Sequence, residues 1–191
     1  MTLADSSALP PAYHRILARS QALQFSMNSD VLTGTLLRSL AASKPGGRIL
    51  DLGTGCGLSA CWLLDGMSAD ASLVSVDIDA SFQAIARDEL GADPRLSIVL
   101  QDGGEYLTTA SGPFDLIFSD AWPGKYSHLE EALGLVEPGG IYVVDDMLPQ
   151  PTWPADHAPK AGALAAELQA LPGFAVTTLH WSTGIMLCVR H

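Results

Sequence analysis

The sequence is poor in basic residues and in cysteine. It contains 10 Lys and Arg against 21 Asp and Glu, a formal net charge of −11, which disfavours the electrostatic attraction on which most nucleic-acid binding depends. Its three cysteines, Cys56, Cys61 and Cys188, are too few and too badly spaced for a disulfide framework or a thiolate zinc site. We expect buried, reduced thiols, and a small molecule rather than a nucleic acid as the partner.

Long apolar runs are also missing. No run approaches the roughly 18 residues that a membrane-spanning helix needs, and the start of the chain, MTLADSSALPPAYHR, lacks the basic and apolar segments of a signal peptide. We therefore expect a cytoplasmic protein without membrane attachment. With 48% hydrophobic and 16% charged residues, the composition is that of an ordered globular chain.

The chain instead alternates apolar runs with helical stretches. Runs suited to buried strands occupy 48–52, 73–77, 96–100, 114–120 and 140–145. The stretches between them that are predicted to be helical are 58–67, 81–90 and 126–136. This spacing indicates βαβ units and a mostly parallel sheet with helices on both faces, which is a doubly wound α/β fold.

The end of the chain departs from this alternation. A helix is predicted over 161–171, and 174–181 and 184–191 are then predicted to be strands. The connection between these two strands is too short for a parallel crossover. One of them must run antiparallel, which brings the expected sheet to seven strands with an antiparallel terminal strand.

Two helices are predicted ahead of the first strand, over 11–24 and 30–42. They are placed to cap the sheet edge or to cover the ligand. The length of 191 residues suits one domain with a sizeable core. We expect a single domain over 1–191, with covering helices in 1–44 and the core in 45–191.

A glycine-rich turn follows the first predicted strand. In ILDLGTGCGLSACWLL, residues 49–64, Gly53, Gly55 and Gly57 alternate before a helix that begins near Leu58. Glycines permit positive φ and a close approach by a ligand, and the free N–H groups of the helix start can donate to a carboxylate or phosphate. The GxGxG spacing differs from the GxGxxG of dinucleotide folds. A tight turn without a ligand is the alternative.

Acidic residues end the next two predicted strands. Asp77 ends the second, and Asp102 follows the third. Ligands of parallel sheets bind beyond the carboxyl ends of the strands, near the switch point, so these residues are expected to line one crevice. Asp77 is placed to bind a ribose diol, and Asp102 lies where an adenine amine could be held. Helix capping is the alternative role, and we expect it for Asp79 and Ser81.

Four segments together resemble the class I S-adenosylmethionine-dependent methyltransferases: ILDLGTGCGLSACWL, VSVDID, FDLIFSDAWPGKY and PGGIYVVDDM. Within that class they are most similar to the O-methyltransferases related to catechol and caffeoyl-CoA O-methyltransferase. The resemblance runs from about Leu32 to Met147. It implies a Rossmann-like methyltransferase fold, S-adenosylmethionine as the cofactor, and methyl transfer to an oxygen of a small hydroxylated or aromatic acceptor. Such proteins are often dimers, so a homodimer is left open.

The resemblance also implies which residues bind the cofactor. The positions concerned are Gly53, Thr54, Gly55, Ser59, Asp77, Ile78, Asp102, Gly103 and Asp120. The backbone of the glycine turn would cradle the methionine part, and Ser59 would bind its carboxylate. Asp77 would bind the ribose, while Asp102 and Gly103 would flank the adenine.

Three aspartates are implied to hold a metal ion. Asp120, Asp145 and Asp146 match positions where metal-dependent members bind magnesium, and their hard oxygen ligands suit Mg²⁺ or Ca²⁺. The family usually has Asn in place of Asp146, and Pro123 stands where it has a lysine. Lys125, two residues further on, could substitute for that lysine. Asp120 and Lys125 are the candidate catalytic residues. The alternative is that Asp145 accepts backbone N–H bonds and Asp146 caps the next turn.

Residues in flanking segments complete the candidate site. The segment SMNSDVLTGTLL resembles the family's covering segment, which makes Met27 and Asn28 candidates for contact with the cofactor. Trp122 and Trp153 could stack on a flat acceptor or pack against prolines. His157 could face the substrate or solvent.

Three other functions are compatible with these motifs. An RNA-modifying methyltransferase of the same fold is disfavoured by the acidic composition. A protein that binds the cofactor without catalysis gains support from the missing family lysine. An aminopropyl transferase would suit an acidic crevice, which could bind its polyamine.

Overall fold

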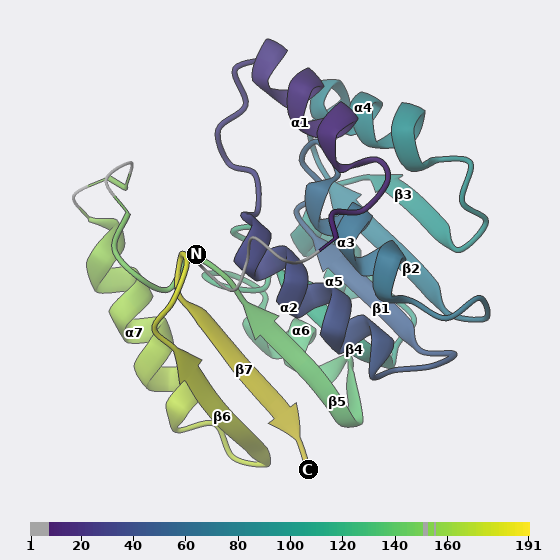
Figure 1. Ribbon diagram of the computed structural model, residues 1–191. Helices are drawn as coiled ribbons and strands as arrows, with labels where there is room; N and C mark the ends of the chain where they lie inside the picture. Colours follow the sequence, from purple (N-terminus) through teal and green to yellow (C-terminus); the bar gives the residue numbers. More distant parts are fainter. Residues whose placement is uncertain (1–7, 151–152, 155) are drawn as a thin grey trace.

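A computed structural model describes residues 8–150, 153–154 and 156–191. Over these residues the chain forms one seven-stranded sheet with helices on both faces (Figure 1). The strands are β1 (Arg48–Leu52), β2 (Ser72–Asp77), β3 (Leu96–Leu100), β4 (Phe114–Ser119), β5 (Val136–Val144), β6 (Phe174–Leu179) and β7 (Ile185–Arg190). The helices are α1 (Tyr13–Ala22), α2 (Val31–Ala42), α3 (Leu58–Gly66), α4 (Ala80–Leu90), α5 (Gly103–Thr109), α6 (Leu129–Gly134) and α7 (His157–Gln169). Of the helices described, none is long and apolar enough to cross a membrane.

The sheet extends from β1 in two directions. Its strand order is β3-β2-β1-β4-β5-β7-β6, and β1 pairs in parallel with both β2 and β4. Strands β1 to β5 are parallel, whereas β7 runs antiparallel to its neighbours β5 and β6. The predicted doubly wound fold, with seven strands and an antiparallel terminal strand, is confirmed. The carboxyl end of β1 is the switch point, where folds of this kind bind their ligands.

The strand register brings four strand ends to one level. Leu52 pairs with Val76 on one side and with Ser119 on the other. Ser119 in turn pairs with Val144. The residues that follow these pairs are Gly53, Asp77, Asp120 and Asp145. The glycine turn and three carboxylates therefore share one rim of the sheet.

The helix predicted over 126–136 is wrong in its bounds, because α6 is much shorter. Tyr126 lies in a tight turn, where its N–H donates to the carbonyl oxygen of Trp122 at 2.9 Å. His128, directly before α6, has a φ of 55°, which is incompatible with a continuous helix. The turn thus takes up the first residues of the predicted helix.

Two further features near the rim differ from expectation. β5 begins at Val136 rather than at residue 140, so it takes the end of the predicted helix. α5 follows β3 and was not among the predicted helices. Asp102 caps it by accepting the N–H groups of Gly104 and Glu105 at 2.9 and 3.0 Å. Two glycines at its start weaken its helical pattern, and the cap compensates for them.

Hydrophobic clusters fill the space on each side of the sheet. One packs beneath α1 to α4, and the other packs beneath α5 to α7 (Figure 1). Every residue from Leu58 to Leu64 of α3 is buried, as expected for a helix that is covered on both sides. The three cysteines are buried and free, which confirms the expectation from their number and spacing.

Close packing of α2 on α3 gives a test of this arrangement. A Cβ atom at Gly34 of α2 would lie 2.2 Å from Nε1 of the buried Trp62. Gly34→Ala should therefore lower the free energy of unfolding by about 1 to 3 kcal/mol, although alanine is the better helix former. Urea unfolding would measure the change. Gly162→Ala is the matched control, because Gly162 of α7 has no atom within 4 Å of such a Cβ, so that variant should be slightly stabilised.

Candidate cofactor and acceptor site

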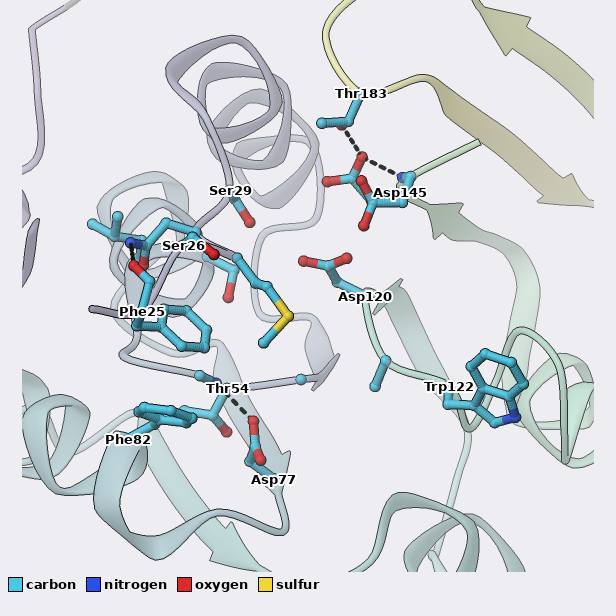
Figure 2. A pocket seen from close by; sticks show the side chains of 18 of the residues that line it. Phe25, Ser26, Ser29, Thr54, Asp77, Phe82, Asp120, Trp122, Asp145 and Thr183 are labelled. Carbon is cyan, nitrogen blue, oxygen red and sulfur yellow. Dashed lines mark hydrogen bonds between the residues drawn. The ribbon is translucent and has the colours of Figure 1, made fainter. Parts of the chain in front are cut away.

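A cavity of about 700 Å³ opens at the carboxyl ends of β1, β2, β4 and β5. Its wall contains the glycine turn, residues that follow each of these strands, part of the loop between α1 and α2, and the start of α7. Figure 2 shows Asp77 and Asp145 on opposite sides of the cavity with Asp120 between them. The cavity therefore lies at the switch point of the sheet, where the order of the motifs had placed a ligand.

The glycine turn is packed closely on its surroundings. Gly53 and Gly55 have φ values of 109° and 48°, which side chains rarely adopt. A Cβ atom at Gly53 would lie 2.8 Å from the carbonyl oxygen of Asp120, and one at Gly55 would lie 2.9 Å from the ring of Phe25. The turn thus needs glycine for its own packing, and it presents backbone to the cavity.

Asp77 joins the end of β2 to this turn. Its carboxylate accepts the N–H of Gly55 at 2.7 Å (Figure 2). It also accepts the N–H of Asp79 at 3.0 Å. A carboxylate has about four acceptor positions, so two remain for hydroxyl donors. Asp77 lines the cavity and is held in a fixed orientation, as a residue that binds a diol should be.

The residues predicted to bind the cofactor fall into two groups. Those on the cavity wall are Gly53, Thr54, Gly55, Ser59, Asp77 and Asp120. Those away from the wall are Ile78, Asp102 and Gly103. Asp102 caps α5, as in the alternative that capping offered. Ile78 is 70% exposed. Because Asp102 and Ile78 lie away from the cavity wall, only a ligand that extends out of the cavity could reach them.

Asp51 is a buried carboxylate that was not among the residues predicted for the site. It lies within β1, where its Oδ2 accepts the hydroxyl groups of Ser59 at 3.2 Å and Ser75 at 2.7 Å. Its Oδ1 is buried and has no hydrogen-bond partner among the described residues. Burial raises the pKa of Asp51 to about 7. The available signal was an acidic residue inside the otherwise apolar strand RILDL.

The acidic rim contains one buried cation. Nζ of Lys125 lies 3.4 Å from Oδ1 of Asp120 and donates to the backbone carbonyl of Asp145 at 2.9 Å. Burial raises the pKa of Asp120 well above its usual range, and Lys125 opposes this shift. Burial also raises the pKa of Asp145 to about 6. The two predicted catalytic residues, Asp120 and Lys125, are therefore brought together.

The residues do not fit the predicted metal ion in this arrangement. Within the described ranges, no group of three or more His, Cys, Asp and Glu side chains could hold a metal. Asp120 faces an ammonium group, and Oδ1 of Asp145 accepts both the hydroxyl of Thr183 and the N–H of Asp146. The alternative to a metal site was that Asp145 accepts backbone N–H bonds, and it accepts one from Asp146.

An aromatic wall closes the other end of the cavity. It is formed by Trp122, Tyr126, Trp153 and His157. The hydroxyl of Tyr126 lies 3.1 Å from Nε2 of His157, and the rings of Trp153 and His157 are 4.3 Å apart. Trp122 is 50% exposed, and its ring lies 4.7 Å from that of Tyr126 and 5.1 Å from Nζ of Lys160. In the segment 147–159, whose last three residues belong to α7, Pro151, Thr152 and Ala155 lie outside the described residues.

The two candidates in the covering segment also reach the cavity. Met27 and Asn28 both line it. Met27 is 72% exposed, whereas the amide of Asn28 donates to the hydroxyl of Ser20 at 2.9 Å. Asn28 thus anchors the loop to α1, and Met27 is free to contact a ligand.

This fold, with its cavity at the switch point of the sheet, matches a known family. A family model described as a methyltransferase domain matches residues 50–147, just over half of the chain. The protein belongs to this methyltransferase-domain family. The matched region includes the glycine turn, Asp77, Asp120 and both aspartates that follow β5.

Individual relatives carry similar names. The chain is 37% identical over 117 residues to a Mycolicibacterium vanbaalenii protein named "Putative O-methyltransferase", a match that covers 58% of this chain and 52% of that protein. A Mycobacterium avium protein of the same name is also 37% identical, with 58% and 53% covered. The chain thus spans about half the length of the curated relatives that it matches.

Solved structures match over nearly the whole chain. The structure of cofactor-bound Rv0187 from MTB is 25% identical, with a TM-score of 0.85 over 99% of this chain and 92% of that one. The structure of SAH-bound Podospora anserina methyltransferase PaMTH1 is 23% identical, with a TM-score of 0.84 over 98% and 91%. Because the identity to PaMTH1 is only 23%, that similarity shows a shared fold and nothing more.

Asp51 gives a prediction about stability and pH. A buried carboxyl with a raised pKa binds its proton more tightly in the folded state, so the free energy of unfolding falls as pH rises from about 4 to about 7. At 1.36 kcal/mol per pKa unit, the loss is roughly 4 kcal/mol at most. Asp51→Asn should abolish this loss, so the variant should exceed the wild type in stability at pH 8.

Urea unfolding at pH 4.5 and pH 8 would measure the effect. Glu167→Gln in α7 is the control, because Glu167 is exposed and should leave the pH profile unchanged. Parallel profiles for the wild type and Asp51→Asn would show that Asp51 does not hold a proton in the folded protein.

Proposed function

We propose that this protein is an S-adenosylmethionine-dependent O-methyltransferase whose acceptor is a small aromatic hydroxyl compound. The observation that carries the proposal is the continuity of one cavity, which joins the glycine turn and Asp77 to an aromatic wall through Asp120 and Lys125. A methyl donor at the first end and a flat acceptor at the second would meet beside Asp120. Family membership and the names of the mycobacterial relatives support this function.

The donor end suits a cationic nucleoside. S-adenosylmethionine carries a ribose diol, a sulfonium and an amino group. Asp77 offers two free acceptor positions for the diol, and the glycine turn offers backbone at close range for the methionine part. Asp51, one hydrogen bond behind Ser59, adds a carboxylate that a cationic ligand would favour in its ionised form.

The acceptor end suits a flat ring with a hydroxyl group. Aromatic rings stack on indole side chains, and Trp122 lines the cavity with half of its surface exposed. The pair formed by Tyr126 and His157 supplies polar atoms at the same wall. The net charge of −11 disfavours an RNA acceptor.

The chemistry requires alignment and removal of one proton. The acceptor oxygen attacks the methyl carbon in line with the sulfonium, the carbon–sulfur bond breaks, and its electron pair stays on sulfur in S-adenosylhomocysteine. The hydroxyl proton passes to the carboxylate of Asp120 and then to water. Alignment contributes on the order of 7 to 11 kcal/mol in the best-oriented cases. The raised pKa of Asp120 makes it a stronger base than an ordinary carboxylate.

Asp77 provides the test of the cofactor. Asp77→Ala should weaken S-adenosylmethionine binding by about 1 to 3 kcal/mol, because a charge-assisted contact with the ribose is lost. Isothermal titration calorimetry would measure it. Asp102→Asn is the comparison and should change the affinity less, since Asp102 follows the neighbouring strand β3 but lies off the cavity wall. An unchanged affinity for Asp77→Ala would remove its proposed role.

Trp122 provides the test of the acceptor. In assays with a panel of phenols and dihydroxybenzenes, Trp122→Ala should raise KM about tenfold or more and leave cofactor affinity unchanged, because a stacking surface is lost. Half of Trp122 is exposed, so its removal should cost little stability. Trp122→Phe retains a ring and should recover most of the affinity. Equal KM values in all three proteins would place the acceptor elsewhere.

A further inference from the structure

Lys125 occupies the place where the family resemblance put a metal ion. Its side chain is buried, at 5% exposure, and lysine is seldom buried unless it is paired. Its two oxygen partners are Oδ1 of Asp120 and the backbone carbonyl of Asp145. Both partners belong to residues that were implied to ligate the metal. The position of the ammonium group therefore coincides with the expected cation site.

A divalent ion and this ammonium group would compete for the same carboxylate. A metal ion would lie about 2.0 to 2.6 Å from a carboxylate oxygen that it binds. The ammonium group lies 3.4 Å from Oδ1 of Asp120, so the two cations would be close neighbours. An ion on Asp120 would thus lie against a buried positive charge. One oxygen of Asp145 is also engaged, because Oδ1 accepts bonds from Thr183 and from the N–H of Asp146.

The ammonium group retains a donor for a ligand. Lysine has three N–H donors, and two of them have partners among the residues that the structure describes. Lys125 lines the same cavity as the glycine turn and the aromatic wall. The third donor is therefore available to an acceptor oxygen beside Asp120.

We propose that Lys125 is a built-in cation of the acceptor site, which holds the acceptor oxygen in place of a divalent ion and keeps that ion out. The role of Lys125 toward the acceptor rests on the proposed function. The exclusion of a metal ion by Lys125 does not depend on that function. The proton of the acceptor goes to Asp120, and Lys125 takes part only as a hydrogen-bond donor. Methyl transfer then proceeds without a divalent metal.

A lysine and a divalent ion at this position would favour different substrates. A metal ion with two open positions can chelate the neighbouring hydroxyl groups of a diol, whereas one N–H donor holds a single oxygen. A second hydroxyl beside the first is therefore not required by Lys125. The acceptors expected are simple phenols as well as 1,2-dihydroxybenzenes, with similar kcat/KM values for the two.

The decisive experiment removes the cation and titrates metals without cofactor. In the wild type, millimolar Mg²⁺, Mn²⁺ or Ca²⁺ should not change Tm. Lys125→Met leaves Asp120, Asp145 and Asp146 without their ammonium neighbour, and Mn²⁺ or Ca²⁺ should then raise its Tm by several degrees. Lys125→Arg is the matched control, because it keeps the positive charge and should remain indifferent to metals.

Two results would overturn the proposal. One is a metal-dependent rise in the Tm of the wild type, and this reading does not depend on how well any variant folds. The other is a folded Lys125→Met that binds no metal; Lys125→Gln would be used in its place if Lys125→Met does not fold. Absence of S-adenosylmethionine binding would instead count against the proposed function, and the metal titrations would still test Lys125.

Activity supplies a second readout once an acceptor is found. Wild-type methyl transfer should stay within about twofold after treatment with EDTA, whereas Lys125→Met should lose activity at least a hundredfold and regain part of it with Mn²⁺. Loss of wild-type activity on chelation, restored by Mg²⁺, would show that a metal and not Lys125 serves the acceptor.

Discussion

The parallel pairing of β1 with β2 on one side and β4 on the other is the constraint on which the site depends. This pairing places Leu52 level with Val76 and Ser119, so the segments that follow must leave the sheet at one rim. They leave it so close together that a side chain at Gly53 would meet the backbone of Asp120. A glycine turn at this position is thus a condition of the sheet as much as of ligand binding, and the cavity lies in the space beyond it.

The same constraint gathers negative charge, and the structure offsets it with different partners along the rim. Backbone N–H groups hold the carboxylate of Asp77, and hydroxyl groups hold that of Asp51. Asp120 has the ammonium group of Lys125. Buried carboxylates with so few partners keep raised pKa values, as Asp51 and Asp120 do. The rim is therefore suited to a cationic ligand and to accepting a proton.

Sequence patterns were most reliable where one local property decides the structure. The strands 48–52 and 96–100 have the predicted bounds, because short apolar runs between turns suit buried strands. The stretch 126–136 failed because its apolar residues are shared by a turn, a short helix and the start of β5. Asp77 ends β2 and Asp102 follows β3, yet the first lines the cavity and the second caps α5. Their local sequences do not distinguish these roles.

The sequence by itself determined the order of the strands, every helix but α5, the glycine turn, and the presence of acidic residues at or just after the strand ends, since each follows from neighbouring residues. Only the tertiary structure decided which of those residues meet. Lys125 lies two residues beyond the family's lysine position, and the tight turn that follows β4 brings its ammonium group back to Asp120 and Asp145. Whether a carboxylate faces a metal, a lysine or a helix end depends on contacts between segments far apart in the chain, and spacing along the chain does not contain them.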